Sequence, residues 1–124
     1  MTKSIVVDLD RQVLVALDDT RHVYEFDCAS GDSSHPTPVG RWKILRKHMK
    51  YTSHTYKVPM NFAMFFTTTG EAIHESHAVA VTSFAKYFGI NALGSHGCVR
   101  LSSSDAAKLF NWTPLHTPVE IKKK

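Results

Sequence analysis

The first part of the chain contains three short runs that favour extended structure: two that are rich in β-branched and aliphatic residues, and a third in which apolar and polar residues alternate. The runs cover residues 4–9, 12–17 and 22–28. In the second run, Val13, Val15 and Leu17 fall on one face of an extended chain. The polar breaks at residues 10–11 and 18–20 suit hairpin turns. These runs predict a β-meander, so the fold must be built around a sheet.

More strands and two helices are predicted further along. We expect strands at residues 40–46, 61–67, 70–74 and 119–121, and a loop at residues 29–38, which are rich in Gly, Ser and Pro. In residues 78–88 the apolar side chains recur at helical spacing, and Gly89 can end that helix. A second helix is expected over residues 103–110, where Ser102 and Asp105 resemble a capping box.

The length of 124 residues allows one core, so residues 1–124 are predicted to be a single domain. Many short strands with two short helices predict a mainly β fold, either a sandwich or a barrel. The content of hydrophobic residues, 43%, is ordinary for a globular protein.

The segment Ser95-His96-Gly97-Cys98-Val99-Arg100 carries the chemistry. A base or a cation near a thiol lowers its pKa and favours the reactive thiolate. Glycine lets a substrate carbonyl approach the backbone, and the guanidinium of Arg100 can hold a carboxylate. A buried structural cysteine is the alternative, but it leaves the polar neighbours unexplained. The segment therefore predicts a nucleophilic cysteine.

Three segments together resemble the L,D-transpeptidase catalytic domain of the YkuD-like family. Residues 95–100 are similar to the nucleophile motif, residues 37–44 to a Thr-Pro-x-Gly-x-aromatic-x-Ile segment, and residues 72–74 to an element that ends in the catalytic histidine. Two departures are Glu75, where the family commonly has Gly or Ser, and a longer interval between the histidine and the cysteine. The resemblance implies a mixed β-sandwich.

The resemblance also implies an activity on peptidoglycan stem peptides. Cys98 would attack the carbonyl that follows an L-centre, and His74 would act as the base. Backbone N–H groups near Gly97 would stabilise the oxyanion. The thioester would pass to an amine that the sequence does not identify, with hydrolysis or D-amino-acid exchange as side reactions. Carbapenems are expected to be covalent inhibitors.

The other site residues have narrower roles. Ser95 is expected to orient the loop or His74, and His96 to line the pocket, because it lies two positions before Cys98 on an extended segment. His77 is the reserve candidate for the base. Arg100 is expected either to bind a substrate carboxylate or to support the loop. The remaining histidines are expected on the surface or in loops: His22, His35, His48, His54 and His116.

Other functions use the same residues. A peptidoglycan hydrolase or an interbacterial toxin would keep the Cys98 nucleophile. A zinc site would use His74, His77, His96 and Cys98, but no Cys-x-x-Cys pair is present. A wall-binding module without catalysis would use Arg100. Neither a metal nor another cofactor is expected for the enzyme.

Charge and hydropathy limit the partners. A net charge of +4 without an aromatic-rich basic stripe argues against nucleic acid. No apolar run is long enough to span a membrane, and no signal peptide precedes the first strand pattern. A periplasmic or cell-wall location is expected from the activity, with an unknown export route, and we expect a monomer. A disulfide between Cys28 and Cys98 would disable the nucleophile, so Cys28 is expected to be a small core residue.

Overall fold

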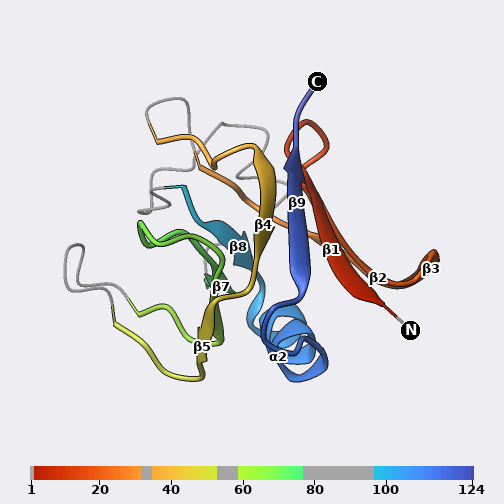
Figure 1. Cartoon of the computed structure of the whole chain (residues 1–124). Coiled ribbons are helices and arrows are strands. Elements are labelled where there is room, and N and C mark those ends of the chain that lie inside the picture. The colour runs from red at the N-terminus through yellow and green to blue at the C-terminus, as the bar shows by residue number, and fades with distance from the viewer. Residues whose placement is uncertain (1, 32–34, 53–58, 77–96) are drawn as a thin grey trace.

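Two β-sheets and one helix make up the described part of the protein (Figure 1). The computed structural model describes residues 2–31, 35–52, 59–76 and 97–124. The first sheet contains β1 (Lys3–Asp8), β2 (Val13–Asp18), β3 (Arg21–Asp27), β4 (Gly40–Lys43) and β9 (Pro118–Lys122), in the order β3-β2-β1-β9-β4. The second contains β5 (Arg46–His48), β6 (Ala63–Phe65), β7 (Ala72–Glu75) and β8 (Val99–Leu101), in the order β5-β6-β7-β8. The mainly β class and the mixed sheets predicted from the sequence are confirmed.

The first three strands form the predicted meander, because β2 pairs antiparallel with both β1 and β3. Leu14 and Ala16 of β2 are fully buried, whereas Val13, Val15 and Leu17 share the opposite, half-buried face. This alternation is the pattern of a strand that covers a core on one side. The last strand, β9, joins the sheet parallel to β1, as expected for a strand that closes it.

The single strand predicted over residues 40–46 is wrong, because the chain changes sheets within it. Ile44 is fully buried, and its N–H donates to Thr117 O at 3.0 Å, next to the first sheet. The N–H of the following residue, Leu45, donates to Phe65 O at 2.7 Å, in the second sheet. The residues have β propensity throughout and both halves of the segment are extended, so the sequence does not show where the chain leaves one sheet for the other.

The four-stranded sheet differs from its prediction in detail. The strands expected at residues 61–67 and 70–74 form only as β6 and β7, so His74 is the third residue of its strand rather than a terminal one. The sequence did not predict β8, which has three residues and is too short to show a period. This strand lies parallel to β7, whereas β5, β6 and β7 pair antiparallel.

The helix α2 (Ser103–Trp112) runs two residues beyond its predicted end. The hydroxyl of Ser102 accepts a hydrogen bond from Asp105 N at 3.3 Å, so the predicted N-cap is present. At the other end, Lys47 Nζ donates to Phe110 O and Thr113 O, both at 2.6 Å. A cation there satisfies carbonyls that lack helical partners. The other predicted helix, residues 78–88, lies outside the described residues.

One hydrophobic cluster joins both sheets and α2. It includes Val7 and Ile121 of the first sheet, Ile73 and Val99 of the second, and Leu109 of α2. Figure 1 shows α2 at one end of the two sheets, close to the lower ends of β9 and β5. The helix α2, the one helix of the described part, is not long and apolar enough to cross a bilayer.

Candidate active site

Two parallel strands bring the predicted base and the predicted nucleophile together. β7 and β8 pair with His74 beside Arg100, and the same register carries Cys98 alongside Ala72. Side chains of laterally paired residues point to the same face, so these four share one face of the sheet. From the strand spacing and the rise per residue, the Cα atoms of His74 and Cys98 are about 8 Å apart.

The site lies on the face of this sheet that is turned away from the first sheet. Ile73 and Val99 point to the other face and belong to the core between the sheets. Ala72 and Cys98 belong instead to a second buried cluster, with Phe65. We call the face of Ile73 the inner face and the face of Cys98 the outer face. Because alternate residues of a strand point to opposite faces, the core residues and the candidate catalytic residues lie on opposite sides of the same two strands.

The Cys98 thiol is 7% exposed, and it donates a long hydrogen bond to Gly70 O, with 3.9 Å between Sγ and O. Burial raises its pKa to about 11, and the negative charge of Glu71 adds to this effect, whereas a backbone hydrogen bond from Ala72 and the charge of Arg100 oppose it. The sequence predicted a lowered thiol pKa, whereas burial in the fold raises it. The thiol is neutral at pH 7 and needs a base to react.

His74 has the properties of such a base. Its Nδ1 lies 2.6 Å from Glu75 O, and because a carbonyl only accepts, Nδ1 carries the proton and Nε2 keeps its lone pair. The side chain is 5% exposed. Burial lowers its pKa to about 4 against the opposing bond to Glu75, and the charge of Arg100 lowers it further. The imidazole is therefore neutral at pH 7.

The bond from His74 also explains why Glu75 can replace the family's small residue. The acceptor is the backbone carbonyl of Glu75, which every residue type provides. The side chain of Glu75 instead accepts a hydrogen bond from Asn61 Nδ2 at 3.4 Å. The departure at this position leaves the orientation of the imidazole unchanged.

Gly97 is required by its backbone and by its neighbours. Its φ of +92° lies in a region that residues with a Cβ rarely adopt. A Cβ would also lie 3.0 Å from Glu71 Cγ and 3.3 Å from Pro36 O. The backbone before Cys98 is thus held between two loops.

The Thr-Pro-containing segment supports this arrangement from one side. Thr37 is buried, and its hydroxyl accepts a hydrogen bond from Gly31 N at 2.9 Å. A Cβ on Gly31 would lie 3.0 Å from Gly97 Cα, so the two backbones are in close contact. The start of the segment of residues 37–44, ahead of β4, therefore belongs to a loop that shapes the backbone at the nucleophile.

Arg100 is 2% exposed. Its backbone forms two hydrogen bonds with Ala29, at 2.8 and 3.0 Å, which join β8 to the end of the meander. Burial lowers the pKa of its guanidinium. Its charge nevertheless acts on both Cys98 and His74.

Glu71 is a neighbour of the nucleophile that the sequence did not indicate. Its Oε1 accepts hydrogen bonds from Thr67 Oγ1 and Thr69 Oγ1, both at 2.5 Å, and the carboxylate lies against Gly97. Short hydroxyl side chains ahead of a glycine and an acid are typical of a turn that bonds its own side chains. This signal was present in residues 67–71, but it did not point to the distant cysteine.

Other predicted residues fall into two groups. Ser95, His96 and His77 lie outside the described residues. Cys28 is fully buried in the cluster between the sheets, and both cysteines are free thiols, so the expectation of a small core residue is confirmed.

Within the described ranges, no three His, Cys, Asp or Glu side chains gather as ligands for a metal ion. Two of the four residues of the zinc alternative, His77 and His96, are not among those described. His74 and Cys98 alone do not provide the ligands of a closed zinc site.

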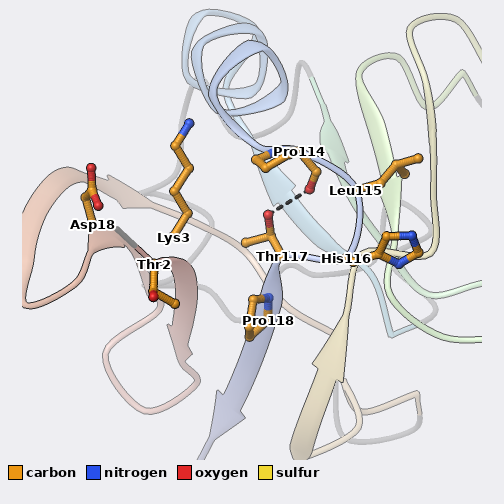
Figure 2. A pocket seen from close by; sticks show the side chains of 8 residues that line it. All are labelled: Thr2, Lys3, Asp18, Pro114, Leu115, His116, Thr117 and Pro118. Carbon is orange, nitrogen blue, oxygen red and sulfur yellow. Dashed lines mark hydrogen bonds between the residues drawn. The ribbon is translucent and has the colours of Figure 1, made fainter.

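A pocket of about 440 Å³ lies elsewhere, between the start of β1 and the connection from α2 to β9 (Figure 2). Its lining residues are Thr2, Lys3, Asp18, Pro114, Leu115, His116, Thr117 and Pro118. Lys3 Nζ donates to Trp112 O at 2.7 Å, and Thr117 Oγ1 donates to Pro114 O at 2.7 Å. These polar groups serve the fold, and the pocket contains none of the candidate site residues.

Comparisons with known proteins identify the family of this chain. Residues 2–121 match the YkuD family model, described as the L,D-transpeptidase catalytic domain. L,D-transpeptidase 1 of Mycobacterium tuberculosis is 29% identical over 102 residues, which is 73% of this chain and 39% of that protein. The crystal structure of an L,D-transpeptidase from Stackebrandtia nassauensis has a TM-score of 0.83 at 28% identity, over 98% of this chain and 56% of that one.

A mutant of an Enterococcus faecium L,D-transpeptidase has a TM-score of 0.77, also at 28% identity, over 98% of this chain and 50% of that one. The chain thus spans about two fifths of the curated relative and about half of these solved structures. The family model covers nearly the whole sequence, and the likeness in structure extends over the same residues. The chain therefore belongs to the YkuD family of L,D-transpeptidase catalytic domains.

Proposed function

We propose that this protein is a cysteine-dependent L,D-transpeptidase of peptidoglycan stem peptides, with Cys98 as the nucleophile and His74 as the general base. The observation that carries the proposal is the parallel register of β7 and β8, which puts the thiol and a neutral imidazole on one face of neighbouring strands. The unprotonated Nε2 of His74 and the protonated thiol are a base and an acid in the forms that the first step needs.

Acylation begins when Cys98 Sγ attacks the carbonyl carbon that follows the L-centre. The thiol proton moves to His74 Nε2 as the C–S bond forms, so no free thiolate has to accumulate in a site that disfavours it. The imidazolium then gives this proton to the nitrogen of the departing D-amino acid. The C–N bond breaks, and the products are a thioester on Cys98 and a free amine.

Transfer to the acceptor reverses the order of events. A neutral amine attacks the thioester carbon and gives a proton to His74 Nε2. The C–S bond breaks with its electron pair on sulfur, which then takes the proton back from the imidazolium. The result is a new amide and a restored thiol. Water in place of the amine gives hydrolysis, the alternative function on the same nucleophile.

The surrounding residues support the two steps in different ways. Backbone N–H groups at Gly97 and Cys98 would stabilise the oxyanion, since the positive φ of Gly97 fixes the backbone directly before the nucleophile. The burial of Arg100 favours its second predicted role, support of the loop, over direct capture of a substrate carboxylate. Its positive charge would stabilise the transient negative charge on sulfur.

The wider setting follows from the substrate class. Peptidoglycan places the reaction in the periplasm or cell wall, and residues 1–124 would act as a single catalytic domain. The mechanism requires neither a metal nor another cofactor.

Defined muropeptides, with products identified by mass spectrometry, test the proposal. The wild-type protein should release the terminal D-amino acid, and Cys98→Ala should abolish turnover without unfolding the protein. Cys28→Ala is the matched control and should stay active. Turnover by the Cys98→Ala protein would refute the cysteine mechanism.

A free D-amino acid added to the same reaction separates transfer from hydrolysis. It should divert the thioester from hydrolysis to exchange, because an amine competes with water for the acyl group. Hydrolysis that does not respond to added amine would leave a hydrolase on the same nucleophile.

A further inference from the structure

A row of four side chains crosses the outer face from the nucleophile to the opposite edge of the sheet. Arg46 of β5 pairs with Phe65 of β6, and Phe65 pairs with Ala72 of β7. The parallel register then places Cys98 beside Ala72. Paired residues share a face, so all four side chains point outward, and we call them the cross-sheet row. Since strands are about 4.8 Å apart, Phe65 lies on the order of 10 Å from Cys98.

The side chains in the middle of the cross-sheet row are buried, and the side chain at its edge is exposed to solvent. Phe65 and Ala72 are buried, whereas Arg46 is exposed. The guanidinium carbon of Arg46 lies 3.8 Å from the centre of the Phe65 ring. The positive charge is therefore held over the Phe65 ring, on the outer face that also carries Cys98, and it stays accessible to solvent.

The Arg46 side chain is fixed by its neighbours. Its Nη1 donates to His48 Nε2 at 3.1 Å, since a guanidinium only donates. The ring of Tyr51 stands edge-on to Phe65 at 5.1 Å, and the guanidinium also lies over that ring, at 5.8 Å. Stacked guanidinium groups keep their outer N–H groups available to an anion.

None of the ion pairs in the described part of the chain involves Arg46. A fixed and accessible guanidinium without an acidic partner there matches the geometry of a carboxylate, which it can bind through two parallel hydrogen bonds.

We propose that Arg46 binds a carboxylate of the donor peptide, on the order of 10 Å from the acyl carbon on Cys98. This inference rests on the proposed function, because it takes Cys98 as the point of acyl attachment. An extended peptide advances about 3.3–3.6 Å per residue, so the carboxylate belongs to a residue about two or three residue lengths from the scissile carbonyl. Arg46 would thus select donors that carry an acid at this distance.

The direction of the row assigns it to the donor rather than to the acceptor. His74 exchanges protons with the departing and arriving amines, so both amines lie on its side of Cys98. His74 lies one strand from Cys98 and two residues further along the strand direction, whereas Arg46 lies three strands away in the same row as Cys98. The acyl part of the donor can therefore follow the cross-sheet row, across the strands, toward Arg46.

Equilibrium binding to the otherwise intact Cys98→Ala protein tests the proposal without turnover. The probes are synthetic tetrapeptides with one carboxylate at the first or second residue, and the same peptides with that carboxylate converted to an amide. With Arg46 present, one acidic peptide should bind about 10- to 100-fold more tightly than its amide, the range of a hydrogen bond to a charged group. Arg46→Gln should reduce this preference to below about threefold.

Two further variants separate recognition from packing. Arg46→Lys keeps the charge and should retain part of the preference, because it lacks the paired N–H groups. Arg41→Gln removes an exposed arginine of the first sheet and should leave the preference unchanged. Thermal unfolding shows whether each variant is folded at the assay temperature.

Weak or equal binding of all acidic and amidated peptides to the protein with Arg46 would overturn the proposal, as would a preference that survives in Arg46→Gln. These outcomes are distinct from a failure of the proposed function. That failure would appear as the absence of a thioester on Cys98 with every donor, whatever the pattern of binding.

Discussion

At β7 and β8, both the inner and the outer face of the four-stranded sheet carry buried side chains, but the two faces use burial in different ways. On the inner face, Ile73 and Val99 are apolar, and burial stabilises the fold directly. On the outer face, burial of His74 and Cys98 keeps both groups neutral. The same strands thus provide a core on one side and a matched acid and base on the other. Polarity, and not exposure, distinguishes a site from a core here.

Of the changes that distinguish the two faces, His74→Ala should have the largest effect on catalysis. Loss of a positioned general base costs about 10²–10⁴-fold in rate, and kcat/KM with muropeptides should fall by that factor. His77→Ala should have a much smaller effect. The opposite ranking would move the base to His77 and shift the alignment with the family by three positions.

The neighbouring residue on the inner face should show the complementary behaviour. Ile73→Ala should lower the free energy of unfolding by about 2–5 kcal/mol, because it leaves a cavity in the core between the sheets. Its kcat per folded molecule should change by less than about threefold, since the side chain points away from Cys98. Urea denaturation and activity of the same sample measure both. A large loss of kcat with unchanged stability would contradict the separation of the faces.

The outer face should also make the protein sensitive to acid. The pKa of His74 is about 4 in the folded state and about 6.5 in the unfolded state, so the unfolded chain binds more protons between these values. The resulting stability is complete above pH 6.5 and is lost as the pH falls to 4, by up to about 3 kcal/mol. Denaturation at pH 7 and pH 4 should show a smaller acid loss in His74→Gln. An identical loss in both proteins would argue against a buried neutral imidazole.

A smaller effect is expected at Glu71, whose charge raises the pKa of the Cys98 thiol. Glu71→Gln keeps an oxygen for the two threonine hydroxyls but removes the charge. The pH profile of Cys98 alkylation by iodoacetamide, measured in a Cys28→Ala background, should move to lower pH. Glu25→Gln, an exposed change on β3, is the control and should not move it. An unchanged profile in Glu71→Gln would show that this carboxylate does not act on the thiol.

Local patterns predicted much of the scaffold. Strand periodicity indicated the meander, and the cap at Ser102 located the start of α2. The change of sheet at residues 44–45 was not predictable, because it depends on hydrogen bonds to residues far along the chain, such as Thr117. β8 was missed for a similar reason, since a three-residue strand is defined by its partner.

Residue types pointed to the candidate nucleophile and base, but their protonation did not follow from the sequence. The motif around Cys98 suggested an acidic thiol, whereas desolvation dominates in the fold. Glu71 lies against Gly97 through a contact between two loops, and Arg46 joins the outer face through the pairing of β5 with β6. His48, expected on the surface, is half-buried against the ring of Tyr51. Contacts that depend on how distant strands pair could not be predicted from local patterns along the chain.

Peptide mass spectrometry of the acyl-enzyme tests most directly whether Cys98 is the nucleophile. The protein is mixed with a donor tetrapeptide without an amine acceptor, quenched with acid and digested. The acyl mass should appear on the peptide that contains Cys98, be released by hydroxylamine as a thioester is, and be absent from the peptide of Cys28 and from the Cys98→Ala protein. An acyl group on another residue, or product formed by the Cys98→Ala protein, would contradict this assignment.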